Sequence, residues 1–205
     1  MQPSAEKRIY AQFTKIKAPF LQPLVKTLDV FGVKPDLLSY LGVGLMLWFV
    51  FVAGSNPVLG FWLIVSRGLL DSIDGPLARY QKNGSDRGKF TDALMDQLGF
   101  LLFMCGLVKA DLVSSLPALV LAYSTLLVTV LMVVKKNLNK NSDWLIKAFA
   151  GAFPHTIIYI CYGLYGVFAF ADHNYFRKVF IVFSGLMVAK AISDYVIIRS
   201  TKFNN

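Results

Sequence analysis

Six long apolar stretches dominate the sequence and constrain its fold. A helix that crosses a bilayer needs about 20 mostly apolar residues. The chain is 56% hydrophobic and only 16% charged, which is typical of an integral membrane protein rather than a soluble domain. We therefore expect an all-α fold: an integral membrane bundle of six transmembrane helices in a single domain, residues 1–205. The expected helices are residues 37–54, 57–80, 89–108, 112–134, 143–170 and 175–198.

The segment before the first expected helix has a different pattern. Apolar residues recur from Ile9 to Phe20 at spacings of three and four, with basic and polar residues between them. This pattern predicts an N-terminal amphipathic helix that lies in the membrane interface. Residues 1–31 are thus expected to form a juxtamembrane interfacial segment, and residues 32–205 the bundle. The segment has no continuous apolar core, so we expect no cleavable signal peptide.

Basic residues in the loops predict the orientation in the membrane. The net charge is +9, and most basic residues fall in the N-terminal segment, the second and fourth connections, and the C-terminal tail. By the positive-inside rule, both termini and these connections are cytoplasmic. The basic surface then faces anionic membrane lipids, and we expect no binding of nucleic acid.

Four aspartates lie in the second and third apolar stretches, where charge is costly. Asp71 and Asp74 are three residues apart, and Asp92 and Asp96 are four apart, so each pair shares one helix face. The short connection makes the two helices antiparallel neighbours, which lets the four carboxylates converge near the cytoplasmic end. Converging carboxylates repel unless several are protonated or cations neutralise them. Oxygen ligands select hard divalent ions such as Mg²⁺, Mn²⁺ or Ca²⁺, and four carboxylates could bridge two metals.

Small residues and an arginine accompany the aspartates. Gly75 and Gly88 leave helix surface bare, so a ligand could approach the backbone there. Arg79 lies one turn beyond Gly75 and is suited to clamp a diphosphate. The stretch therefore predicts a site for a diphosphate together with divalent metals.

Residues 71–96 read Asp-x2-Asp-Gly-x2-Ala-Arg-x8-Gly-x3-Asp-x3-Asp. This pattern resembles, position for position, the signature of the CDP-alcohol phosphotransferase family. The resemblance implies a membrane enzyme that displaces CMP from a CDP-linked donor with an alcohol acceptor. It also implies two divalent ions, Mg²⁺ or Mn²⁺, and a homodimer.

The resemblance further implies roles for individual residues. Asp71, Asp74 and Asp92 would hold the metals, and Asp96 would complete the metal site and act as the catalytic general base. The CDP-binding residues would be Asp71, Asp74, Gly75, Ala78, Arg79, Gly88 and Ser39. At the start of the first helix the chain departs from the family's usual pattern, because Asp36 and Ser39 stand where Asn and Thr are expected.

The acceptor alcohol is less constrained. An anionic acceptor, such as glycerol phosphate or inositol phosphate, would suit the lysines in or beside the fourth connection, although the positive-inside rule alone would also produce them. Arg67, about one turn before Asp71, either pairs with a site carboxylate or helps to bind an acceptor phosphate. Lys190 and Asp194 are one turn apart and are expected to pair. The candidate acceptor-binding residues are Arg67, Lys135, Lys136, Lys140 and Lys147.

Three functions compete at this point. The first is transfer of a phosphatidyl group from CDP-diacylglycerol, or its ether-lipid equivalent, to a small polar alcohol. The second uses a soluble donor, CDP-choline or CDP-ethanolamine, with diacylglycerol as the acceptor; the short chain favours the first by analogy. The third is transport of divalent cations, for which Gly75 and Arg79 would have no purpose.

Overall fold

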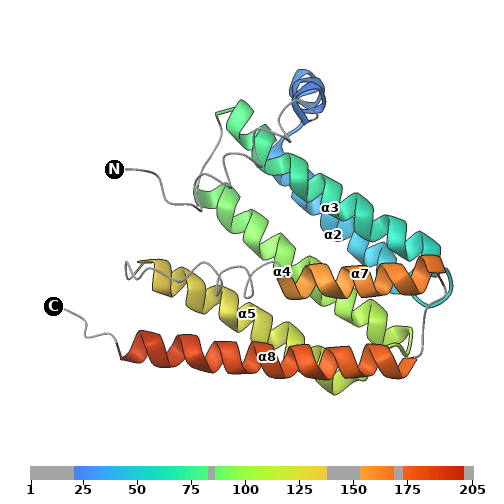
Figure 1. Ribbon diagram of the computed structural model, residues 1–205. Coiled ribbons are helices and arrows are strands. Elements are labelled where there is room, and N and C mark those ends of the chain that lie inside the picture. The colour runs from blue at the N-terminus through green and yellow to red at the C-terminus, as the bar shows by residue number, and fades with distance from the viewer. Residues whose placement is uncertain (1–20, 83–85, 138–152, 169–172, 201–205) are drawn as a thin grey trace. The chain divides into compact units, whose positions relative to one another are not determined.

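The computed structural model describes residues 21–82, 86–137, 153–168 and 173–200. Every regular element in these ranges is a helix, which confirms the all-α prediction for the described part of the chain (Figure 1). Residues 21–30 are helical, and the predicted interfacial helix before them lies outside the described residues. The later helices are α2 (Pro35–Val52), α3 (Pro57–Tyr80), α4 (Asp86–Lys109), α5 (Ser115–Asn137), α7 (Phe153–Phe168) and α8 (His173–Arg199).

Four of these helices contain segments long and apolar enough to cross a membrane. They are Pro35–Val52, Phe90–Lys109, Ser115–Met132 and Arg177–Arg199. Helix α3 is long enough, but Arg67 and its aspartates interrupt the apolar sequence. Helix α7 has 16 residues, which is short for a span. The chain therefore has the helices of a multi-pass membrane protein, while the count of six spans stays a prediction.

Local capping explains where α3 begins and ends. The backbone N–H of Leu59 donates to Asn56 Oδ1 at 3.1 Å, and Pro57 occupies the first helical position, where no backbone donor is needed. The helix continues through Pro76 to Tyr80. Beyond it, Lys82 has a positive φ of 54° and donates to the carbonyl of Arg79 at 3.2 Å. This left-handed residue ends the helix.

A second residue with positive φ lies before α5, and this helix begins later than predicted. Asp111 has φ 56° and donates its N–H to the carbonyl of Val108, and Leu112 donates to the carbonyl of Leu107, both at 3.0 Å. These two bonds form a Schellman cap at the end of α4. Leu112 and Val113 are fully buried in the turn that follows, so α5 begins at Ser115 and not at residue 112 as predicted.

The chain divides into two compact units. Unit 1 comprises residues 1–45 and 65–99, and unit 2 comprises residues 46–64 and 100–205. Helices α2, α3 and α4 contribute residues to both units. All the described aspartates of the signature fall in unit 1.

The core of unit 1 joins the helix at residues 21–30 to α2 and α3. Leu38 of α2 packs with Ile73 and Leu77 of α3, and Val25 completes the buried cluster. The amide of Gln81 donates to the carbonyl of Val33 at 3.0 Å and ties the end of α3 to the turn before α2. This packing fixes the stretch of α3 that carries Asp71 and Asp74.

Unit 2 is built around aromatic side chains. The Phe49 ring lies 5.1 Å from the Phe103 ring and 5.0 Å from the Tyr162 ring, measured between centroids. The hydroxyl of Tyr162 donates to the carbonyl of Ala53 at 2.8 Å, so its buried polar atom has a partner. Helices α5 and α8 run side by side (Figure 1). On α8, Lys190 pairs with the buried carboxylate of Asp194, as predicted.

Many large apolar side chains point outward from the described helices. Trp48 and Trp62 are more than half exposed, and Leu116 is 71% exposed. Exposed apolar surface on this scale is unfavourable in water and ordinary in lipid. The outward faces therefore agree with a membrane setting.

Gly106 should be required for packing in unit 2. A Cβ atom at this position would lie 2.5 Å from Cε1 of Phe49, so Gly106→Ala forces the aromatic cluster apart. We expect a loss of about 1–3 kcal/mol in stability, read as a lower melting temperature in detergent. Gly185→Ala is the matched control, since a Cβ there meets nothing within 4 Å. Equal melting temperatures for the two variants would contradict this packing.

Candidate active site

Three signature aspartates converge in unit 1. Asp71 and Asp74 of α3 and Asp92 of α4 each offer a carboxylate oxygen, and these three oxygens lie within 4.8 Å of one another. The three-residue spacing places the first two on one face of α3, and α4 brings the third alongside. We call these three residues the aspartate cluster.

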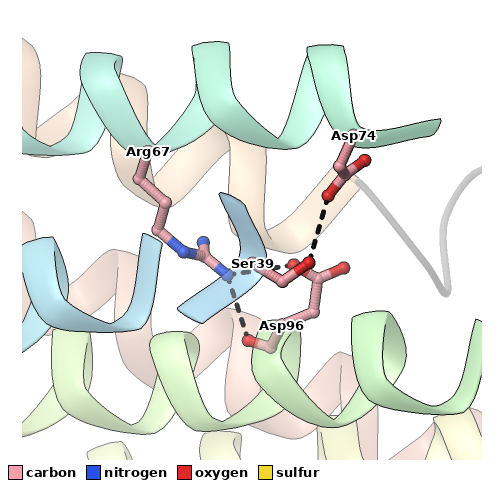
Figure 2. Close-up of polar contacts among 4 residues, drawn as sticks. All are labelled: Ser39, Arg67, Asp74 and Asp96. Carbon is pink, nitrogen blue, oxygen red and sulfur yellow. Dashed lines mark hydrogen bonds and ion pairs between the residues drawn. The ribbon is translucent and has the colours of Figure 1, made fainter. Parts of the chain in front are cut away.

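The aspartate cluster has one buried member. Asp74 is 8% exposed, whereas Asp71 is exposed and Asp92 is half-buried. The hydroxyl of Ser39 on α2 donates to Asp74 Oδ2 at 3.3 Å (Figure 2). A buried carboxylate needs such a partner. Ser39, at the start of the first span, thus orients a carboxylate of the cluster.

Asp96 lies one turn beyond Asp92 on α4 and has a cationic partner. Its Oδ1 is 3.1 Å from a terminal guanidinium nitrogen of Arg67, and the same nitrogen donates to the Asp96 carbonyl at 3.2 Å (Figure 2). Of the two alternatives for Arg67 from the sequence, the structure favours pairing with a site carboxylate. Asp96 therefore differs from the aspartate cluster in its immediate neighbour.

These side chains surround one open cleft in unit 1. All four aspartates, Ser39 and Arg67 line it, and apolar residues form the rest of its wall. The lining residues are Leu38, Ser39, Gly42, Arg67, Leu70, Asp71, Asp74, Asp92, Met95 and Asp96. We call this hollow the aspartate cleft.

The donor atoms of the aspartate cluster suit a hard divalent cation. Carboxylate oxygens are the ligands that Mg²⁺ and Mn²⁺ prefer. Three carboxylates this close repel one another, and the repulsion is strong because apolar packing beside them lowers the local dielectric. A divalent cation would remove that repulsion, so the cluster fits the metal predicted from the sequence.

Gly75 and Arg79 lie together on α3 beside the cluster. A Cβ atom at Gly75 would lie 3.4 Å from a terminal nitrogen of Arg79, so the exposed guanidinium extends back over the bare helix surface. Ala78 is half-buried on the same helix, and Gly88 lies in the first turn of α4. The bare surface thus adjoins a cation that suits a diphosphate.

The side chains of all four candidate acceptor-binding lysines lie outside the described residues. Lys135 and Lys136 belong to the last turn of α5, and their side chains lie outside the described residues. Lys140 and Lys147 also lie outside the described residues.

The sequence pattern did not single out Gly42, which lines the aspartate cleft, or Gly99, which lies against the Arg67 guanidinium. Gly42 lies three residues after Ser39, and Gly99 lies three residues after Asp96. Both therefore share a helix face with a site residue. That spacing could have identified the two glycines.

The protein matches a known family over most of its length. The family model of the CDP-alcohol phosphatidyltransferases covers residues 33–194. The chain belongs to this family. The match confirms the resemblance seen in residues 71–96 and identifies the protein as a phosphotransferase enzyme.

Solved structures share the fold at low sequence identity. A phosphatidylinositol phosphate synthase of Mycobacterium tuberculosis with bound CDP-diacylglycerol is 15% identical, with a TM-score of 0.73, over 90% of this chain and 96% of that one. The same synthase in complex with manganese and citrate is 14% identical, with a TM-score of 0.69, over 88% of this chain and 89% of that one. At these identities the likeness concerns the fold.

A protein of Aquifex aeolicus, named only as an uncharacterized protein, is similar in sequence. It is 36% identical over 80 residues. The match spans 38% of this chain and 40% of the Aquifex protein.

Removing one carboxylate of the aspartate cluster should weaken metal binding. We expect Asp92→Asn to lower the affinity for Mn²⁺ by about tenfold or more, measured by calorimetry or by electron paramagnetic resonance of free Mn²⁺. The melting temperature without metal should not fall, because the substitution removes repulsion. Asp111→Asn, at a side chain that is 90% exposed in unit 2, is the control and should bind Mn²⁺ normally. Unchanged affinity in Asp92→Asn would exclude this residue as a ligand.

Proposed function

We propose that the protein transfers the phosphatidyl group of CDP-diacylglycerol, or of its ether-lipid equivalent, to the hydroxyl of a small polar alcohol and releases CMP. The observation that carries this proposal is the aspartate cluster, with Asp96 one turn further, in a chain of the CDP-alcohol phosphatidyltransferase family. Support for a lipid donor comes from the similar mycobacterial synthase, which has CDP-diacylglycerol bound.

Divalent metal is the proposed cofactor. Asp71, Asp74 and Asp92 would be its ligands, with Asp96 as a fourth, and two ions of Mg²⁺ or Mn²⁺ would be held. When bound, the metal offsets charge on the diphosphate and on the leaving phosphate. The carboxylate ligands and the manganese complex of the mycobacterial synthase support this choice of metal.

The donor's CDP moiety would bind along α3. The guanidinium of Arg79 would contact the diphosphate, and the bare surface at Gly75 would let the nucleotide approach the helix. Asp71 and Asp74 are also proposed residues of the CDP site, and Ser39 would hold Asp74 in place. The remaining proposed contacts are Ala78 and Gly88.

Asp96 is the proposed general base. An alcohol is a weak nucleophile near neutral pH, so a carboxylate beside it must take its proton as it attacks. The alcohol oxygen attacks the β-phosphorus of the donor while its proton passes to Asp96. The bond between the β-phosphorus and the bridging oxygen breaks, and that oxygen leaves with CMP. Asp96 suits this role because its side chain is 48% exposed and lines the aspartate cleft.

The membrane setting of the proposal follows from the sequence. The bundle would have six spans with both termini in the cytoplasm, and the aspartate cleft would open on the cytoplasmic side. A site there can meet a lipid donor and a water-soluble acceptor. A polyol phosphate is the proposed acceptor class, with Lys135, Lys136, Lys140 and Lys147 as candidates for its phosphate. The enzyme would act as a homodimer.

One assay tests the reaction. Purified protein with CDP-diacylglycerol and Mn²⁺ is given glycerol phosphate, inositol phosphate, inositol, serine or choline, and the lipid product is identified by mass spectrometry. We expect CMP release and a new phospholipid with a polyol phosphate. Asp96→Asn should lower kcat by about 10²–10⁴-fold, because the proton then has no acceptor of the right basicity. EDTA should abolish turnover, and added Mn²⁺ should restore it.

Other outcomes would identify a different function. Product from CDP-choline and diacylglycerol, with none from CDP-diacylglycerol, would assign a soluble donor. Flux of Mn²⁺ into liposomes without nucleotide, together with no CMP release, would favour a transporter. Unchanged turnover in Asp96→Asn would refute its role as the base.

A further inference from the structure

We propose that Arg67 is a positioning residue that holds the Asp96 carboxylate in one orientation, so that its Oδ2 atom faces the acceptor hydroxyl. This inference rests on the proposed function, because it assigns a partner to the proposed base. It concerns a residue outside the signature of residues 71–96, and it depends on contacts made within unit 1.

The first support is the way Arg67 contacts Asp96. One terminal nitrogen donates to the side-chain Oδ1 at 3.1 Å and to the backbone carbonyl of the same residue at 3.2 Å. The guanidinium therefore bonds both to the carboxylate and to the helix that carries it. A carboxylate on its own can rotate about two side-chain bonds, and this double contact restricts both rotations.

The second support is a slot that holds the arginine. A Cβ atom at Gly99 of α4 would lie 2.7 Å from two guanidinium nitrogens of Arg67, so a larger residue would displace the guanidinium. A Cβ atom at Gly42 of α2 would lie 3.6 Å from Cγ of Arg67, which is ordinary contact distance. Both glycines are buried. We call Gly42 and Gly99 the arginine slot.

The Arg67 and Asp96 side chains differ in how much of each is exposed. The Arg67 side chain is 13% exposed, and the Asp96 side chain is 48% exposed. The arginine is thus packed into the protein, while part of the carboxylate remains open to the aspartate cleft. Figure 2 shows one oxygen of Asp96 directed toward Arg67 and the other pointing away from it. The second oxygen, Oδ2, is therefore the atom assigned to receive the proton.

The alternative role for Arg67 is to bind an acceptor phosphate. Arg67 lines the aspartate cleft, but its side chain is 13% exposed and one terminal nitrogen is bonded to both the carboxylate and the backbone carbonyl of Asp96. An acceptor phosphate would therefore have to compete with Asp96 for that nitrogen. The two roles also predict different kinetics. A positioning residue changes kcat, because the base is misplaced when the substrates are bound. A phosphate-binding residue chiefly raises KM for the acceptor.

The experiment measures kcat, both KM values and Mn²⁺ affinity for the wild type and a set of variants. Arg67→Ala and Gly99→Ala should each lower kcat by about 10–100-fold, with both KM values near those of the wild type and Mn²⁺ still bound through the aspartate cluster. Arg67→Lys should recover part of the loss, because a lysine can still bond to Asp96. Gly44→Ala is the matched control on α2, since a Cβ there meets nothing within 4 Å, and it should keep the wild-type kcat.

A double variant tests whether the arginine slot acts through Arg67. If Gly99→Ala works by displacing the guanidinium, then adding it to Arg67→Ala should cause no further loss of kcat. Losses that multiply would show that Gly99 acts independently and would overturn that step. Retained Mn²⁺ binding through the aspartate cluster, together with an unchanged KM for the donor, shows that the site is still folded.

The remaining outcomes separate this inference from the proposed function. An active wild type whose kcat survives Arg67→Ala would overturn the positioning role alone. A rise in the acceptor KM at constant kcat would do the same and assign Arg67 to acceptor binding. A folded wild type without turnover on any CDP-linked donor would overturn the proposed function and the positioning role with it.

Discussion

Concentrated negative charge in an apolar protein is the constraint on which this structure depends. The aspartate cluster places three carboxylate oxygens within 4.8 Å of one another in a chain that is 56% hydrophobic. Such an arrangement raises the free energy of the folded state unless the charges are compensated. Compensation is local: Ser39 donates to Asp74, and Arg67 pairs with Asp96. A divalent cation would stabilise the cluster itself. The stability of the folded state and the proposed catalysis would therefore both require a bound cation.

Glycine is what allows these helices to approach the charged groups and each other. In unit 1, Gly99 admits the Arg67 guanidinium, and Gly75 leaves surface beside Arg79. In unit 2, Gly106 admits the ring of Phe49. Small residues serve this purpose in membrane helices, where association depends on close packing rather than on the hydrophobic effect. The sequence thus places glycines where a neighbouring side chain enters, and beside Arg79, where the proposed donor would bind.

The sequence predicted the elements well because their signals are local. Apolar runs predicted the helices, and the spacing of the aspartates predicted that α3 and α4 carry them on facing surfaces. The predicted start of α5 was three residues too early. Asp111 adopts a left-handed conformation that ends the preceding helix, and apolar periodicity does not reveal it. The sequence left two alternatives for the partner of Arg67, a site carboxylate or an acceptor phosphate. It could not decide between them, because the contact joins residues 29 positions apart on different helices. Such pairing depends on helix rotation, which a single sequence specifies weakly.

The aspartates of the signature are chemically identical, so their neighbours must separate their roles. Asp74 is buried against α2 and bonded to Ser39, which favours a fixed ligand. Asp96 is bonded through one oxygen to the largely buried Arg67, while its side chain lines the aspartate cleft. A carboxylate held in this way keeps one oriented oxygen for the substrate, as the proposed base requires. The proposed division of roles therefore rests on Ser39 and Arg67, which contact these aspartates and lie outside the signature.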